Sequence, residues 1–198
     1  MLVLLDTSAS MLDESIALVL RRRNQDPDAQ RQAPKWRQAL ATVDWITAHF
    51  AQASRFQIYT YDSAAHAVLP GTDGEWQDVG DATRLDEAVQ RLQLRVPAGG
   101  SSLERALMVI EQMTPAPDNV FLITDSLPTM GLAPTGSTTV SGEARLKLFE
   151  SAVRRVAPSI PINVVLLPME GDPMAAFAYW QLALATQGAF LSPSADWP

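Results

Sequence analysis

The sequence contains no cysteine and only two histidines. The missing thiols exclude disulfide bonds, thiolate metal sites and cysteine nucleophiles. They leave the cellular compartment open, because a chain without cysteine is stable in oxidising and in reducing surroundings. Neither His49 nor His66 accompanies a motif that would use it as a general base, so we interpret both as surface or packing residues.

Positive charge is also scarce. The formal net charge is −7, and Lys35 and Lys147 are the only lysines. Binding to a phosphate backbone requires clustered cations, so we expect no nucleic-acid partner. We interpret the one basic run, residues 21–23, as a solvated helix end. No apolar stretch approaches the roughly 18 residues of a bilayer crossing and no signal peptide is recognisable, so we expect no membrane insertion of this segment.

Short apolar runs alternate with amphipathic segments along the chain, which is typical of a mostly parallel sheet with helices on both faces. The run 66–69 follows the strand candidate 56–61 after a short turn, so we expect a hairpin and one antiparallel edge strand. The predicted fold is therefore a doubly wound, Rossmann-like α/β fold with a six-stranded sheet. The expected strands are residues 2–5, 56–61, 66–69, 120–124, 162–167 and 189–191. The expected helices are residues 12–23, 35–50, 85–92, 103–113, 143–156 and 173–186.

No internal repeat and no second core are visible, so residues 1–198 are predicted to form a single domain, either complete in itself or part of a longer protein. Two segments are harder to assign. Residues 12–33 are expected to hold one helix and a loop. Residues 130–142 are rich in glycine, proline, serine and threonine, and form either a recognition loop or an insertion at the carboxyl end of the sheet.

The chain has five tryptophans, which divide into two groups. Trp36, Trp45 and Trp180 lie in expected helices, and we predict that they belong mostly to the core. Trp76 lies in a polar loop and Trp197 in the tail. These two are predicted to be either partner contacts or clasps within the chain.

A cluster of oxygen-bearing side chains follows the first strand, with no histidine, cysteine or lysine next to it. Asp6, Ser8 and Ser10 occupy every second position directly after the strand. Asp125 directly follows the strand 120–124, and Ser101 comes just before a helix. Because the carboxyl ends of parallel strands meet at one edge, we expect these side chains to lie close together. Carboxylate and hydroxyl oxygens suit Mg²⁺ or Mn²⁺, whereas zinc would prefer nitrogen or sulfur. The pattern predicts a site for a hard divalent cation.

Three motifs occur in a fixed order at these strand ends: "DTSAS" at 6–10, "GGSSLERAL" at 99–107 and "ITDSLPT" at 123–129. They resemble the motifs of the von Willebrand factor A domain family with its metal-ion-dependent adhesion site (MIDAS). The resemblance implies the doubly wound fold and a bound divalent cation, Mg²⁺ or else Mn²⁺ or Ca²⁺. It implies that Ser8 and Ser10 hold the ion directly, that Ser101 takes the position of the third-loop threonine among the ligands, and that Asp6 and Asp125 hold the ion directly or through water.

The chain departs from the family pattern in several places. Ser101 replaces a threonine, and the loss of the stiffening methyl group predicts a lower metal affinity. Ser126 stands where glycine is common, and it is predicted at the rim or in a second layer of the site. Ser102 either caps the following helix, which we favour, or supports the site as a second layer, and Thr129 is either a rim residue or a turn residue. The tail 192–198 forms no closing helix, so we expect no piston-like switch.

The resemblance implies a protein-binding module for adhesion or assembly, in which the cation accepts an acidic side chain of a partner protein. We do not expect an enzyme, because no histidine is placed to activate Ser8 or Ser10. The alternatives are a Mg²⁺-dependent phosphoester hydrolase and a structural subunit with a vestigial metal site. Domains of this family occur in adhesins, in bacterial envelope proteins and beside AAA-type ATPases. The arginine bias and short loops favour a bacterial protein, and we expect the envelope or periplasm rather than the cytoplasm.

Overall fold

The structure, a computed structural model, describes residues 1–133, 140–194 and 196–198. Among these residues the sheet has seven strands, and its main path runs β3-β2-β1-β5-β6-β7. The neighbours from β2 to β7 pair in parallel, while β3 and β4 each pair with β2 in antiparallel orientation. The predicted doubly wound α/β fold is confirmed, and the two-residue strand β4 adds to the six expected strands. The strands are β1 (Leu2–Asp6), β2 (Arg55–Tyr61), β3 (Ala65–Ala67), β4 (Gln77–Asp78), β5 (Val120–Thr124), β6 (Ile162–Leu166) and β7 (Phe190–Leu191).

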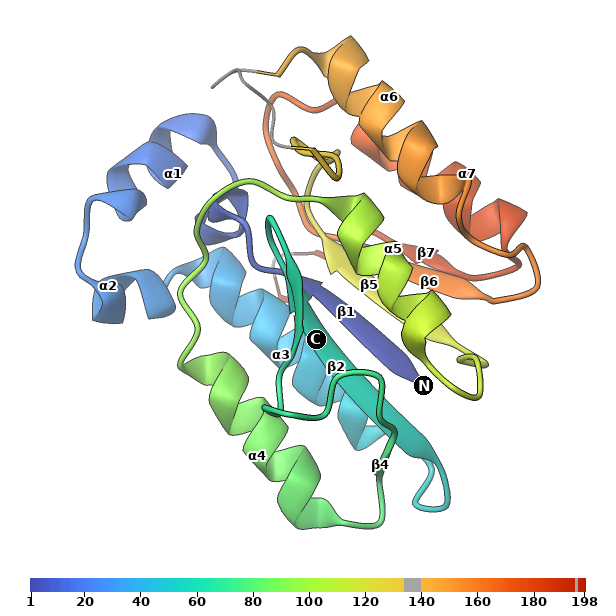
Figure 1. The fold of residues 1–198 in the computed structure, drawn as a ribbon. Coiled ribbons are helices and arrows are strands. Elements are labelled where there is room, and N and C mark those ends of the chain that lie inside the picture. Colours follow the sequence, from blue (N-terminus) through green and yellow to red (C-terminus); the bar gives the residue numbers. More distant parts are fainter. Residues whose placement is uncertain (134–139, 195) are drawn as a thin grey trace.

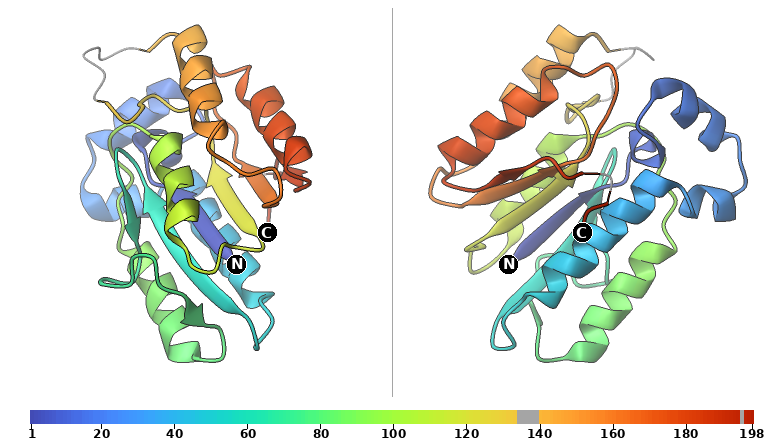
Figure 2. Two further views of the ribbon diagram at one scale, coloured as in Figure 1. Left: turned by 45° about the vertical axis from the view of Figure 1, so that its right-hand side comes forward. Right: turned by 180° about the vertical axis from the view of Figure 1, so that it is seen from behind.

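Helices cover both faces of this sheet (Figure 1). The view from behind in Figure 2 shows α3 lying across the face opposite to α5. The segment 12–33, expected to hold one helix, contains two, because Ser15 and Asp26 each accept a backbone hydrogen bond that starts a new one. The helices are η1 (Ala9–Leu12), α1 (Ile16–Arg23), α2 (Pro27–Arg31), α3 (Pro34–Ala48), α4 (Ala82–Gln93), α5 (Leu103–Gln112), α6 (Gly142–Val153) and α7 (Ala175–Ala185).

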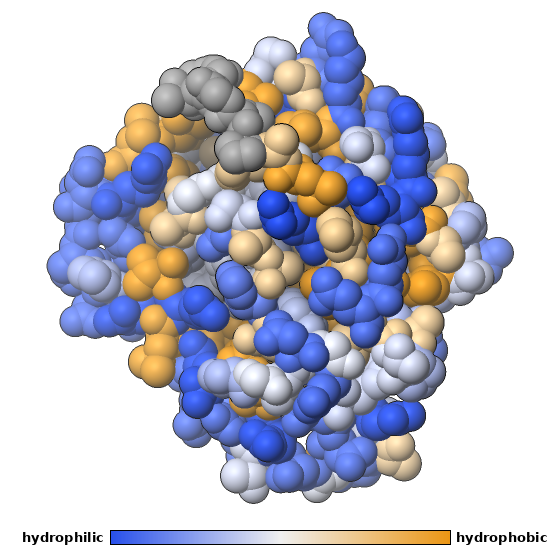
Figure 3. Space-filling view, in the orientation of Figure 1, coloured by the Kyte–Doolittle hydropathy of each residue, from blue (hydrophilic) through white to orange (hydrophobic). Residues whose placement is uncertain are grey.

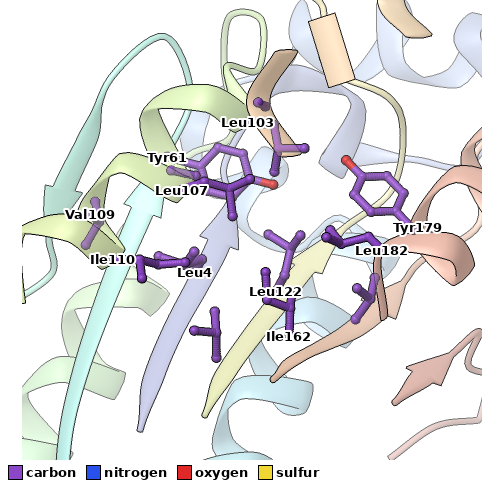
Figure 4. Packing of buried hydrophobic residues seen from close by; sticks show 14 of the residues in the cluster. Leu4, Tyr61, Leu103, Leu107, Val109, Ile110, Leu122, Ile162, Tyr179 and Leu182 are labelled. Atoms are coloured by element: carbon purple, nitrogen blue, oxygen red, sulfur yellow. The ribbon is translucent and has the colours of Figure 1, made fainter. Parts of the chain in front are cut away.

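The strand β1 is buried on both faces and separates two hydrophobic clusters. Leu2 and Leu4 point to the side of α5, α6 and α7, whereas Val3 and Leu5 point to the side of α3 and α4. This alternation is the side-chain period of a strand, and a central parallel strand therefore carries an unbroken apolar run. Figure 4 shows the first cluster, with Leu4 and Leu122 of neighbouring strands beneath residues of α5 and α7. The rigid sheet fixes the positions of the loops at its carboxyl edge.

The prediction for the tryptophans is partly wrong. Trp36 is fully buried, but Trp45 and Trp180 are 43% and 46% exposed, because α3 and α7 turn these positions outwards. Trp76 and Trp197 act as clasps within the chain. The indole of Trp76 donates a hydrogen bond of 2.9 Å to the Pro115 carbonyl, and the ring of Trp197 packs 4.8 Å from that of Trp45.

The surface is mostly hydrophilic in the view of Figure 3, with hydrophobic patches that include the region of α1. Ile16 and Leu20 of this helix are exposed. Among the described residues no helix has the length and hydrophobicity that would let it cross a bilayer. Part of the loop predicted at 130–142, namely 134–139, lies outside the described residues, so the choice between a recognition loop and an insertion stays a prediction.

Candidate metal centre

Three loops meet at the carboxyl edge of the sheet, where β1 and β5 end and α5 begins. Backbone hydrogen bonds tie the first two loops together, from Ala9 to the Gly99 carbonyl (3.1 Å) and from Ala98 to the Thr7 carbonyl (2.9 Å). The third loop joins them through the Thr129 amide, which donates to the Ser101 carbonyl at 3.0 Å. These hydrogen bonds therefore hold the three loops against one another.

The loop before α5 contains two glycines that serve different purposes. Gly99 has a φ of 73°, a left-handed conformation that side chains strongly disfavour. A Cβ atom on Gly100 would lie 2.7 Å from Thr129 Oγ1 and 3.0 Å from Met130 Sδ. The second glycine therefore allows the loops to approach one another closely and brings Ser101 towards the other serines.

The predicted serine donors line one small pocket of about 120 Å³. Ser8 Oγ lies 3.1 Å from Ser10 Oγ, and the Ser10 hydroxyl donates to Asp125 Oδ1 at 3.0 Å. The hydroxyl of Ser101 has no hydrogen-bond partner among the described residues. The pocket is lined by Ser8, Ser10, Gly99, Gly100, Ser101, Ser126, Thr129, Arg145 and Met169.

The two predicted carboxylates are buried and are not among the residues that line the pocket. Asp6 Oδ1 accepts a hydrogen bond from the Ser8 amide at 2.7 Å, and Asp6 Oδ2 accepts one from the Thr124 hydroxyl at 2.9 Å. Burial, followed by the charge of Asp125, raises the pKa of Asp6 to about 7. A nearby cation would favour the ionised form of Asp6, because it would offset the charge of Asp125.

The donor set fits a hard divalent cation. Neighbouring ligands of an octahedral Mg²⁺ ion, at about 2.1 Å from the metal, are about 3.0 Å apart. The separations from Ser8 to Ser10 and from Ser10 to Asp125 are 3.1 and 3.0 Å. Within the described residues no group of three or more His, Cys, Asp or Glu side chains is placed to hold a metal ion. An ion at this pocket would thus depend on the serine hydroxyls as much as on the carboxylates.

A lysine belongs to this site, although none lies next to the oxygen cluster in the sequence. Lys35 Nζ lies 2.6 Å from Asp125 Oδ2, and the two side chains are 1% and 0% exposed. Lys35 is 90 positions away from Asp125 in the sequence, so no local motif reveals the pair. The one available signal is helical spacing, which places Lys35 on the same face of α3 as the buried residues Ala39 and Ile46.

A second ion pair at the pocket was also not anticipated. Arg145 of α6 lines the pocket, and its Nη2 lies 2.8 Å from Asp172 Oδ2. The same carboxylate oxygen accepts the Leu127 amide at 2.7 Å, and Arg145 Nε donates to the Leu127 carbonyl at 3.1 Å. This pair holds the loop after β5 in place.

The three residues predicted at the rim or in a second layer have different positions. Ser126 and Thr129 line the pocket, and Thr129 Oγ1 accepts the Ser101 amide at 3.0 Å. Ser102 occupies the N-cap position of α5, but its side chain makes no capping bond. The favoured capping role is therefore wrong, because the Ser102 hydroxyl donates instead to the Gly131 carbonyl at 3.2 Å.

The fold and the pocket define a class: doubly wound α/β domains that gather serine and aspartate side chains at the carboxyl edge of the sheet. A family model described as the von Willebrand factor type A domain matches residues 1–127, which is more than half of the chain. The chain belongs to the von Willebrand factor type A domain family. No curated protein sequence matches it.

Solved structures with the same fold come from distant proteins. They include a von Willebrand factor type A protein from Catenulispora acidiphila (14% identity, TM-score 0.62, 98% of this chain and 38% of that one). The PilB minor pilin from Streptococcus sanguinis is 13% identical, with a TM-score of 0.55 over 97% of this chain and 57% of the pilin. Proximal thread matrix protein 1 from the mussel byssus, with a zinc-occupied MIDAS motif, is 13% identical, with a TM-score of 0.50 over 96% of this chain and 43% of that one. The chain thus spans less than two thirds of each of these proteins.

Proposed function

We propose that this domain is a protein-binding module for adhesion or assembly whose binding depends on a divalent cation, Mg²⁺ or else Mn²⁺ or Ca²⁺. The observation that carries the proposal is the serine-lined pocket above two buried carboxylates. The ion would be held by Asp6, Ser8, Ser10, Ser101 and Asp125 and would accept an acidic side chain of the partner protein.

Each of these residues has a distinct part in the proposed site. Ser8 and Ser101 line the pocket, and their hydroxyls would supply neutral oxygens for coordination without adding charge. Asp6 orients the first loop through the Ser8 amide and Asp125 orients the Ser10 hydroxyl. When bound, the cation would supply an open position for a carboxylate oxygen.

The structural relatives support the class of function. One of them is a minor pilin and another is a thread matrix protein with zinc in its MIDAS motif, so a motif of this type does take a divalent ion in that protein. By analogy with the pilin, we propose the bacterial envelope or periplasm as the location of this chain. We propose no catalytic role, because the hydroxyls at the pocket have serine and aspartate neighbours suited to coordination.

Calorimetric titration with Mn²⁺ and Mg²⁺ tests the metal site directly. We expect one site in the wild-type protein and a loss of at least about tenfold in affinity in Asp6→Asn, which removes a charge but keeps the shape of the side chain. The matched control is Asp62→Asn, because Asp62 accepts the Ala64 amide in the hairpin turn and lies outside the pocket. Equal affinities in wild type and Asp6→Asn contradict the proposed ligand set.

Relaxation of water protons by bound Mn²⁺ tests the open position. A coordinated water that exchanges with solvent enhances this relaxation, and a carboxylate that displaces it reduces the enhancement. We expect acetate to reduce the enhancement in the wild-type protein, at constant ionic strength. An enhancement that acetate leaves unchanged would mean that the metal does not accept an external carboxylate.

A further inference from the structure

The ammonium group of Lys35 uses all three of its protons in hydrogen bonds to the first and third loops of the site. Its Nζ donates to Asp125 Oδ2 at 2.6 Å, to the Ser10 carbonyl at 3.1 Å and to the Asp13 carbonyl at 3.1 Å. An ammonium has three donors, so these bonds satisfy it fully. The N-terminal end of α3 lies at the same end of the sheet as the end of β1 (Figure 1), which makes the contact possible. The structure therefore places a fixed positive charge beside one proposed metal ligand.

This charge changes the electrostatic balance of the site. Asp6 and Asp125 alone would neutralise a divalent ion. With Lys35 present and both carboxylates ionised, as they would be around a cation, the three side chains carry a net charge of about −1, and the loaded site would carry about +1. Two neighbouring ion pairs add no net charge, since Asp13 pairs with Arg22 at 2.5 Å and Arg145 pairs with Asp172 at 2.8 Å. The excess charge of the loaded site is therefore due to Lys35.

We propose that Lys35 is a positioning residue that couples the two ligands of this site: it weakens binding of the divalent ion alone and strengthens binding of an acidic group once the ion is present. The inference rests on the proposed function. Lys35 holds Asp125 in place in the metal-free protein and repels an incoming cation. A carboxylate that arrives with the ion removes the excess charge, so each ligand raises the affinity for the other by the same factor.

The two lysines of the chain provide a matched pair of variants. Lys35→Met and Lys147→Met remove the same charge, but Lys147 is exposed on α6, where it pairs with Glu143. Mn²⁺ is titrated by calorimetry with chloride or with acetate as the anion, at equal ionic strength. We expect Lys35→Met to bind Mn²⁺ about tenfold or more tightly than wild type in chloride, because a nearby repulsive charge is gone. We expect acetate to raise the affinity in wild type and Lys147→Met, and to raise it much less in Lys35→Met.

The outcomes separate this inference from the proposed function. Equal Mn²⁺ affinity in wild type and Lys35→Met, or equal enhancement by acetate, overturns the role of Lys35 and leaves the metal site standing. If Mn²⁺ binds only to Lys35→Met, the proposed metal dependence of the natural chain is overturned, whereas repulsion of the ion by Lys35 is supported. No binding in any of the proteins overturns both.

Removal of Lys35 leaves Asp125 buried without its partner, so the metal-free variant is expected to be less stable. Lys35→Gln, which keeps an amide donor, serves as the second variant. The midpoint of thermal unfolding is measured for each protein in chelator and in saturating Mn²⁺. A larger metal-induced rise in the Lys35 variants than in wild type supports the inference, and an equal rise contradicts it.

Discussion

Asp6 and Asp125 place two carboxyl groups in a region with almost no exposure to water. Such burial is costly unless each carboxylate finds compensation. Asp125 finds it in Lys35, whereas Asp6 has only neutral donors, the Ser8 amide and the Thr124 hydroxyl. The two aspartates therefore have unequal surroundings, and in the proposed metal site Asp6 would gain more from a bound cation than Asp125.

The raised pKa of Asp6 predicts a particular dependence of stability on pH. In the metal-free protein its pKa is about 7, against an ordinary value of 3.8. The folded state thus holds a proton that the unfolded chain releases, and the contribution of Asp6 to the free energy of unfolding falls as pH rises from about 4 to about 7. Urea unfolding in chelator at several pH values checks this, with Asp6→Asn as the reference that lacks the group. A difference between the two proteins that grows in favour of wild type with rising pH would contradict it.

At the scale of the elements, helices supply the positive charges that the strand ends lack. The helix α3 brings Lys35 to Asp125, and α6 brings Arg145 to Asp172. Hydrophobic spacing predicted both helices to within a few residues, because their apolar faces pack on the sheet. It did not predict these pairs, since ion pairing between distant segments leaves no period in a sequence.

The pair of Arg145 and Asp172 is predicted to hold the loop after β5. Replacement by Asp172→Ala removes the acceptor of the Leu127 amide and leaves a mostly buried guanidinium without its partner. We expect a loss of about 3 kcal/mol in the free energy of unfolding, measured with urea. Glu143→Ala on the same helix breaks an exposed pair with Lys147 and should cost less than about 0.5 kcal/mol. Similar losses of unfolding free energy in both variants would show that the buried pair stabilises the protein no more than the exposed pair does.

At the scale of the whole molecule, the strand order explains why the sequence was informative. β1 and β5 are adjacent at the centre of the sheet, so motifs more than 100 residues apart are brought to one edge. Three motifs, each after an apolar run, were therefore enough to predict which loops meet. The helix expected at 12–23 corresponds to α1, but the short strand β4 and the short helix α2 were missed, because two to five mostly polar residues carry too weak a period.

The burial of Lys35 also has a consequence for the chemistry of the chain. Only two lysines are present, and their side chains are 1% and 69% exposed. An acylating reagent should therefore modify Lys147 at once and Lys35 only when the site opens. The rate of Lys35 acylation, followed by mass spectrometry with Lys147 as internal standard, would measure how often the site opens. Replacement of Asp125 by asparagine should speed the slow reaction, while an unchanged rate would mean that the pair does not hold the site closed. A chain with so few amines thus contains its own reporter of how often its proposed binding site loosens.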